Sequence, residues 1–97
     1  MAIGFTIRFP GGTQAQYIAV HDHLDIENRP PDGLIFHASG PVEGGWCLFD
    51  FWHSHNHFDQ FVEHRLSKAL EELGGSAFPA PPEIAEIHIH NYTVPRI

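Results

Sequence analysis

The sequence predicts a single α+β domain, residues 1–97, whose strands and helices follow in the order βαββαβ. Three observations indicate this class. Residues 2–9 and 46–53 alternate between side-chain types as strands do. Residues 13–25 and the stretch from about 54 to 73 repeat apolar side chains at helical spacing. Clusters of Pro, Gly and Asp separate these segments, and a chain of this length suits one hydrophobic core.

The first predicted strand, residues 2–9, places its apolar side chains at odd-numbered positions: Ile3, Phe5, Ile7 and Phe9. The PGG at 10–12 ends it. Thr13 followed three residues later by Gln16 matches a capping box, and apolar residues then recur at helical spacing as far as Leu24. We therefore expect a helix at about 13–25, followed by a turn in the NRPPDG cluster.

The second half of the chain begins with a predicted hairpin, in which strands at 34–40 and 46–53 flank the loop PVEGG. From about Ser54 the apolar spacing becomes helical and continues to the stop at Gly74. The helical stripe consists of Phe58, Val62, Leu66, Ala69 and Leu73. A final strand is expected at 84–94. This order is that of the ferredoxin-like fold, a four-stranded antiparallel sheet with both helices on one face.

Strand alternation predicts which side chains face the helices. The apolar frame is expected to receive them: Ile3, Phe5, Ile7, Cys47, Phe49, Phe51, Ile87 and Ile89. The opposite frame mixes polar and aromatic groups: Thr6, Arg8, Leu48, Asp50, Trp52, Glu86, His88, His90 and Tyr92. A half-apolar sheet face of this kind usually covers a partner subunit, a ligand or both.

Composition excludes several classes of function. The net charge is −7, with twelve acidic residues against five basic ones that form no cluster. Nucleic acid and anionic membranes need clustered Lys and Arg, so neither is an expected partner. No apolar run approaches the roughly 20 residues of a membrane span. The N-terminus lacks the pattern of a signal peptide, and the single cysteine, Cys47, allows no internal disulfide. We therefore expect a cytoplasmic protein.

Three segments carry a resemblance to a known family: the aromatic strand ending FDFWHS, the following FDQFVEHRLSKALEELG and the closing PPEIAEIHIHNY. In a short βαββαβ chain they resemble the dimeric α/β-barrel superfamily, in particular small proteins related to the antibiotic biosynthesis monooxygenases. The resemblance implies a homodimer whose two sheets close into a barrel, with small-molecule pockets between sheet and helices. It also implies an enzyme or binding protein for an aromatic or polyketide-like substrate, working without flavin or nicotinamide.

The reaction stays open, because members of the superfamily include cofactor-independent oxygenases, aromatic polyketide cyclases, muconolactone-type isomerases and haem-degrading enzymes. His88 and His90 are the leading candidates for a catalytic base, since a histidine near a carboxylate can serve as a base at neutral pH. Arg8 and Asp50 share their frame, and Arg8 is expected to stabilise an anion. His21, on the apolar stripe of the first helix, is a third candidate base. The alternative is an interface in which these polar groups satisfy one another.

Four further residues are expected to contact a substrate: Trp52, Tyr92, Phe51 and Asn56. Aromatic side chains suit the walls of a pocket for a planar molecule. Trp52 and Asn56 are of residue types that the oxygenases of the superfamily use in their pockets. His37, on the second strand, fits either frame and receives no role.

The HxHxH run raises the possibility of a metal site. In an extended strand His53, His55 and His57 would share one face and suit zinc or nickel. If a helix begins near Ser54, however, His55 and His57 diverge by roughly 200°. We therefore expect ordinary surface histidines here. The alternative is a metal or haem site that draws on His53, His57 and His64, or on the terminal-strand pair His88 and His90. A non-enzymatic dimeric accessory protein is the other function class left open.

Overall fold

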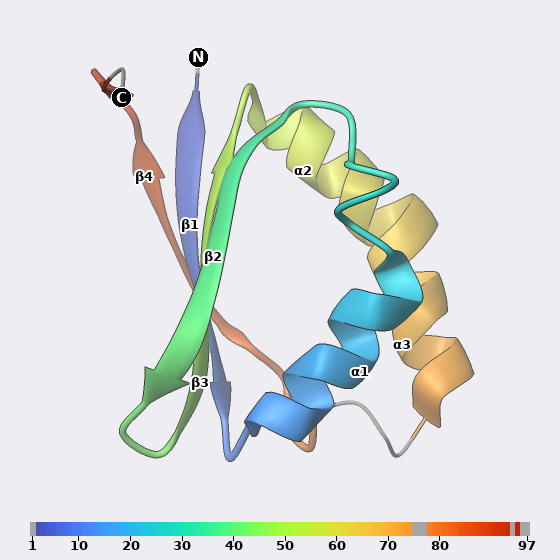
Figure 1. Ribbon diagram of the computed structural model, residues 1–97. Coiled ribbons are helices and arrows are strands. Elements are labelled where there is room, and N and C mark those ends of the chain that lie inside the picture. The colour runs from blue at the N-terminus through green and yellow to red at the C-terminus, as the bar shows by residue number, and fades with distance from the viewer. Residues whose placement is uncertain (1, 75–77, 94, 96–97) are drawn as a thin grey trace.

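Figure 1 shows the protein as a computed structural model that describes residues 2–74, 78–93 and 95. A single sheet in the strand order β2-β3-β1-β4 has antiparallel neighbours throughout, and the helices cover one of its faces. The elements are β1 (Ile3–Pro10), α1 (Gln14–Leu24), β2 (Leu34–Val42), β3 (Gly45–Trp52), α2 (His55–Phe61), η1 (Val62–Leu66), α3 (Ser67–Leu73) and β4 (Glu83–His88). The predicted α+β ferredoxin-like fold is confirmed. In the described part of the chain no helix has the length and apolar character needed to cross a membrane.

The capping box predicted for the first helix is present. The Gln16 backbone N–H donates to the Thr13 hydroxyl at 3.2 Å, and the Thr13 N–H donates to the Gln16 side-chain oxygen at 2.9 Å. Both bonds satisfy donors that a helix N-terminus leaves without a partner. The helix ends where Asp25 adopts a left-handed conformation with φ 55°. Its position on the sheet places Tyr17 and His21 toward the strands.

The second helical stretch runs without a break from His55 to Leu73 but contains a π-helical segment, η1. The extra residue per turn was not expected from the apolar stripe, and π-helical turns often lie beside functional sites. Arg65 in this segment donates to the backbone oxygens of Leu24 and Arg29, each at 2.7 Å. These two bonds tie the end of α1 and the following loop to the second helix.

The prediction of which side chains of β3 and β4 face the helices is wrong. Ile3 lies opposite Trp52, Phe5 opposite Asp50 and Ile7 opposite Leu48, and residues directly opposite in an antiparallel pair share a face. Leu48, Asp50 and Trp52 therefore face the helices together with the buried frame of β1. The apolar residues expected there lie on the outer face instead: Cys47, Phe49, Phe51 and Ile87. Arg8, opposite Cys47, is also on the outer face.

Alternation alone could not reveal this arrangement because both faces of the sheet carry apolar side chains. A shift of one residue in register exchanges the faces of a strand, and only the pairing between strands fixes it. The main core lies between the inner face and the helices. Its buried residues are Ile3, Phe5, Ile7, Phe9 and Trp52 of the sheet and Phe58 of α2. The outer face stays uncovered within the described residues: Phe49 is 52% exposed and Ile87 is 64% exposed.

Candidate functional site

A cavity of about 530 Å³ lies between the inner face of the sheet and the helices. Its walls are mostly apolar and come from β1, β3, α1 and the second helical stretch; they include Ile7, Phe9, Leu24, Leu48, Trp52 and Phe58. The volume falls within the range of small-molecule pockets, roughly 300–1,000 Å³. Such pockets usually combine apolar walls with a few converging polar groups, and this cavity has such a group on one side.

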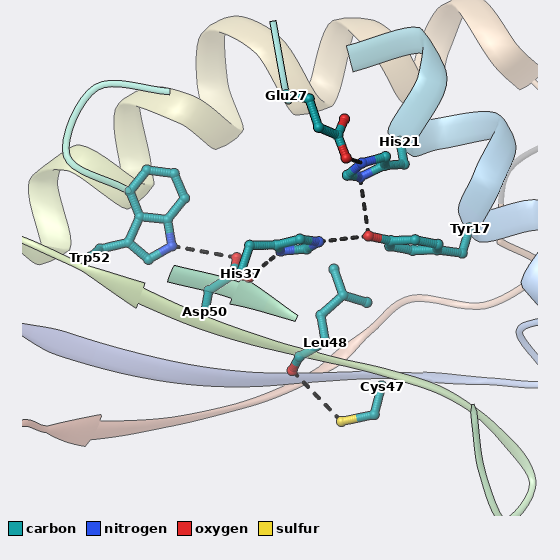
Figure 2. A network of polar contacts seen from close by, with 8 residues as sticks. All are labelled: Tyr17, His21, Glu27, His37, Cys47, Leu48, Asp50 and Trp52. Atoms are coloured by element: carbon teal, nitrogen blue, oxygen red, sulfur yellow. Dashed lines mark hydrogen bonds and ion pairs between the residues drawn. The ribbon is translucent and has the colours of Figure 1, made fainter. Parts of the chain in front are cut away.

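The polar side begins with a buried carboxylate. Asp50 is 4% exposed, and its Oδ1 lies 2.6 Å from Nδ1 of His37 on the neighbouring strand. The indole N–H of Trp52 points to the second oxygen of Asp50 at 3.4 Å. The other ring nitrogen of His37, Nε2, lies 2.7 Å from the Tyr17 hydroxyl oxygen. Figure 2 shows these side chains in one line above the sheet, reaching from Trp52 to α1.

The line continues beyond Tyr17 toward solvent. The Tyr17 hydroxyl oxygen is also 3.0 Å from Nδ1 of His21, and Nε2 of His21 is 2.6 Å from the Glu27 carboxylate. The Glu27 side chain is 72% exposed. Two carboxylate–histidine pairs, one buried and one at the surface, are therefore joined through a single tyrosine hydroxyl (Figure 2). We call these five residues, Tyr17, His21, Glu27, His37 and Asp50, the polar network.

The protons of the network can be counted. A carboxylate holds the histidine proton on the nitrogen that faces it, which places a proton on Nδ1 of His37 and on Nε2 of His21. With neutral imidazoles, Nε2 of His37 and Nδ1 of His21 are then both acceptors. Both face the Tyr17 hydroxyl, which has only one proton to donate. The network therefore has room for one more proton.

Tyr17 remains a neutral phenol at ordinary pH. Burial raises the pKa of its hydroxyl above the usual value of 10.0, and the charges of Glu27 and Asp50 act in the same direction, while Ser39 opposes them. At the solvent end, the hydrogen bond from His21 lowers the pKa of Glu27 below its usual 4.5, which keeps that group a carboxylate. The hydroxyl between the two histidines is thus able both to donate and to accept a proton.

Three residues predicted from the sequence meet at this cavity: Asp50, His21 and Trp52. The predicted grouping of Asp50 with Arg8 is wrong, because Arg8 lies on the outer face. There its guanidinium donates to Glu83 at 2.9 Å and to the Glu43 backbone oxygen at 2.7 Å. Arg8 therefore has no path to an anion in the cavity.

The remaining predicted substrate and base residues also lie away from the cavity. Four are exposed: His88 at the end of β4, His90 and Tyr92 beyond it, and Asn56 in the first turn of α2. Phe51 lies on the outer face and packs against Phe36. The predicted ensemble of Arg8, Asp50, His88, His90 and Tyr92 is therefore not brought together on one side of the sheet.

The HxHxH run is not extended, because β3 ends at Trp52 and α2 begins at His55. The Nδ1 of His57 lies 2.7 Å from the Ser54 hydroxyl, and the His57 ring packs so closely on Gly33 that a Cβ there would overlap it. His53 and His57 have ring centroids 6.3 Å apart, and His64 is exposed on η1. Across residues 2–74, 78–93 and 95, no three His, Cys, Asp or Glu side chains are placed to hold a metal ion. The predicted site of His53, His57 and His64 is therefore not formed.

His37, Tyr17 and Glu27 were not predicted from the sequence as site residues. One signal for His37 was available: counting outward from the Glu43-Gly44 turn of the hairpin places His37 opposite Asp50. Tyr17 was assigned only to the apolar stripe of its helix. Glu27 follows the helix in a loop, and nothing in the local pattern points it back toward His21.

Solved structures with the same fold cover nearly the whole chain. SnoaB, a cofactor-independent oxygenase from Streptomyces nogalater, is 15% identical with a TM-score of 0.67, over 98% of this chain and 98% of that one. A monooxygenase from the gene ActVA-Orf6 of Streptomyces coelicolor, in complex with nanaomycin D, is 16% identical with a TM-score of 0.62, over 98% and 92%. A dimeric ferredoxin-like protein of unknown function from Jannaschia sp. is 10% identical with a TM-score of 0.63, over 92% and 100%.

At these identities the likeness shows the fold alone. No protein-family model and no curated protein matches the sequence. The fold predicted from the resemblance to the antibiotic biosynthesis monooxygenases is therefore confirmed by its structural neighbours. The reaction has to be inferred from the cavity.

Proposed function

We propose that this chain is a cofactor-independent enzyme of the antibiotic-biosynthesis-monooxygenase-like superfamily that removes a proton from a neutral, planar aromatic or polyketide-like substrate. The observation that carries the proposal is the cavity with the polar network on one side. His37, oriented by Asp50, is the proposed base. SnoaB, described as a cofactor-independent oxygenase, is a structural neighbour in keeping with such a role.

The charges around the cavity favour a neutral substrate. Among the described residues that line it there are three carboxylates, Asp50, Asp59 and Glu63, and no Lys or Arg. An anionic ligand would be repelled by these charges in a partly apolar site, where electrostatic interactions are stronger than in water. Flat aromatic walls such as Trp52 and Phe58 suit a planar ring system. A fused phenolic or quinone-like molecule combines these properties.

The proton count supports proton removal. A substrate hydroxyl or an acidic methylene next to the Tyr17 oxygen gives up its proton there, while the Tyr17 proton passes to Nε2 of His37. The product is an imidazolium paired with Asp50, and its positive charge faces the new substrate anion. This imidazolium has the anion-stabilising role that was predicted for Arg8. General-base catalysis of this kind contributes about 10²–10⁴-fold to a rate.

The anion can then react with dioxygen as co-substrate. Dioxygen accepts the electron pair of the substrate anion, so that one oxygen atom becomes bonded to carbon. Loss of the second oxygen as water, with the second methylene hydrogen and the proton held by His37, leaves a ketone. A ring methylene and dioxygen thus yield a carbonyl group and water. The substrate loses four electrons and dioxygen gains four; one oxygen atom ends in the carbonyl group and the other leaves as water with the two methylene hydrogens. Isomerisation or cyclisation would share the first step and need no dioxygen.

The proposal includes a homodimer formed through the outer face of the sheet. Four large apolar side chains are 40% to 64% exposed there: Phe36, Val42, Phe49 and Ile87. An apolar surface of this extent is typical of an interface. The Jannaschia neighbour is described as dimeric. The single cysteine allows no internal disulfide, and we therefore propose that the protein is cytoplasmic.

The test uses 9(10H)-anthracenone, a neutral, planar molecule with an acidic methylene, and measures dioxygen consumption with a Clark electrode. We expect the protein to accelerate consumption and His37→Gln to lower the acceleration by about 10²-fold or more. His53→Gln is the matched control, because His53 lies at the surface outside the cavity lining. Bound anthracenone with no acceleration, or equal rates for His37→Gln and the native chain, would overturn the proposal.

A further inference from the structure

The polar network extends further than a base requires. Asp50 and His37 already supply a histidine base and the carboxylate that orients it. Tyr17 nevertheless also contacts His21, and His21 contacts Glu27. The first carboxylate is buried and the last is 72% exposed. A continuous line of polar groups within hydrogen-bond distance of one another thus leads from the cavity to water. Every link between neighbours measures between 2.6 and 3.0 Å.

We propose that the polar network is a proton relay, in which Tyr17 is the branch point and the His21–Glu27 pair exchanges the proton taken from the substrate with solvent. This inference rests on the proposed function, because it needs a substrate that gives up a proton in the cavity. It assigns a role to Glu27, which no pattern in the sequence suggested. It also changes the expected role of His21 from a base that meets the substrate to a carrier behind Tyr17.

The packing of the rings holds the relay in place. Tyr17 and His21 have centroids 5.2 Å apart at an interplanar angle of 28°, and His21 and His37 are 5.7 Å apart at 16°. Tyr17 is also stacked at 5.6 Å from the buried Trp46. Side chains confined in this way keep donor and acceptor aligned, and a proton moves efficiently only between aligned partners.

The two acceptors of Tyr17 give the relay its function. A proton that reaches the Tyr17 oxygen from the substrate displaces the Tyr17 proton toward one histidine. The hydroxyl can then pass its new proton to the second histidine and take one back from the first. The proton returned to the substrate therefore need not be the one that left it. At the outer end, Nε2–H of His21 donates to Glu27, whose carboxylate is in contact with water.

The relay is tested by hydrogen exchange without oxidation. Anthracenone is incubated with the protein in deuterium oxide under argon, and deuterium in the methylene group is followed by mass spectrometry. The native protein should accelerate exchange well above the rate in buffer. Tyr17→Phe keeps the ring stack and removes the hydroxyl, and we expect it to lower the enzymatic exchange rate by about 10²-fold.

Glu27→Gln is the decisive variant, because its side chain is exposed and its loss does not threaten the fold. We expect exchange to fall about tenfold, and to fall more than dioxygen consumption does in air, since return of the original proton becomes dominant. Glu72→Gln is the matched control: Glu72 forms a similar exposed pair with His23, at 3.1 Å, away from the cavity lining. It should exchange at the native rate.

The possible outcomes separate the two proposals. If the native protein accelerates neither exchange nor dioxygen consumption, the proposed function fails and the relay fails with it. If the native protein accelerates exchange and Glu27→Gln does so equally, the base stands and the relay is overturned. Equal loss in Glu27→Gln and Glu72→Gln would also overturn it, because the effect would then be one of surface charge.

Discussion

Replacing Tyr17 by Phe tests the proton count of the polar network through the free energy of unfolding, without any substrate. The change removes one oxygen and preserves the ring that stacks on His21, His37 and Trp46. Two ring nitrogens lie within hydrogen-bond distance of that oxygen, at 2.7 and 3.0 Å. If the hydroxyl has one proton for two acceptors, only one donated bond is lost. A neutral hydrogen bond contributes about 1 kcal/mol net.

The expected loss in the free energy of unfolding is therefore about 1 kcal/mol. For a chain of 97 residues, with an unfolding entropy of roughly 2.1 cal/mol/K per residue, this lowers Tm by about 5 °C. Urea unfolding at pH 8 measures it, with the m-value unchanged if the denatured state is the same. Tyr92→Phe is the control, since Tyr92 is 44% exposed beyond β4, and its effect should stay within about 0.5 kcal/mol.

Two results would refute this reasoning. A loss of about 3 kcal/mol or more would mean that the Tyr17 oxygen makes two strong bonds, donating to one histidine and accepting a charge-assisted bond from the imidazolium of the other, so that the network already contains the additional proton. No loss at all would mean that the hydroxyl is not an effective donor and that Tyr17 serves only as a stacked ring. In the first case the network has no room for a substrate proton, and in the second the hydroxyl provides no path for one.

Two further predictions concern other parts of the molecule. His55 in α2 is bonded to Asp59 at 2.9 Å and to Glu86 of β4 at 3.2 Å, and the hydrogen bond to Asp59 is the main cause of its raised pKa. Because the folded pKa of His55 is raised, these two bonds are complete below pH 6.5 and are lost as pH rises through the folded pKa. Over that window the exchange rate of the Glu86 amide, relative to its intrinsic rate at each pH, should increase. His55→Gln should remove this dependence on pH. On the outer face, Phe49→Asp places a charge in the proposed interface without touching the core, so light scattering should show a monomer while the circular dichroism spectrum stays native. An unchanged dimer would exclude this face, and Ile18→Asp, at a 45% exposed position on α1, is the matched control.

The elements of the fold were predictable because their signals are local. Thr13 and Gln16 define the start of α1 within four residues, and the Glu43-Gly44 turn defines the hairpin. The order of such elements is enough to indicate a ferredoxin-like sheet. None of these signals depends on residues that are distant in the chain.

The site depended on distant pairings and was predicted only in part. Asp50 was expected beside Arg8, but the pairing of β1 with β3 puts the two on opposite faces. His37 becomes a site residue because it lies opposite Asp50 on the neighbouring strand, and Tyr17 becomes one because α1 packs over β2. Composition showed an unusual number of histidines. It could not show that two of them meet at one hydroxyl.

The central claim is that the cavity receives a neutral planar molecule beside Trp52. The most direct measurement is binding followed by tryptophan fluorescence in a Trp46→Phe variant, in which Trp52 is the only tryptophan. We expect anthracenone to quench this fluorescence saturably, and anthracene-9-carboxylate, of similar shape, to bind at least about tenfold more weakly because of Asp50, Asp59 and Glu63. Equal binding of the two, tighter binding of the carboxylate, or no quenching by either would contradict the assignment of this cavity as the site.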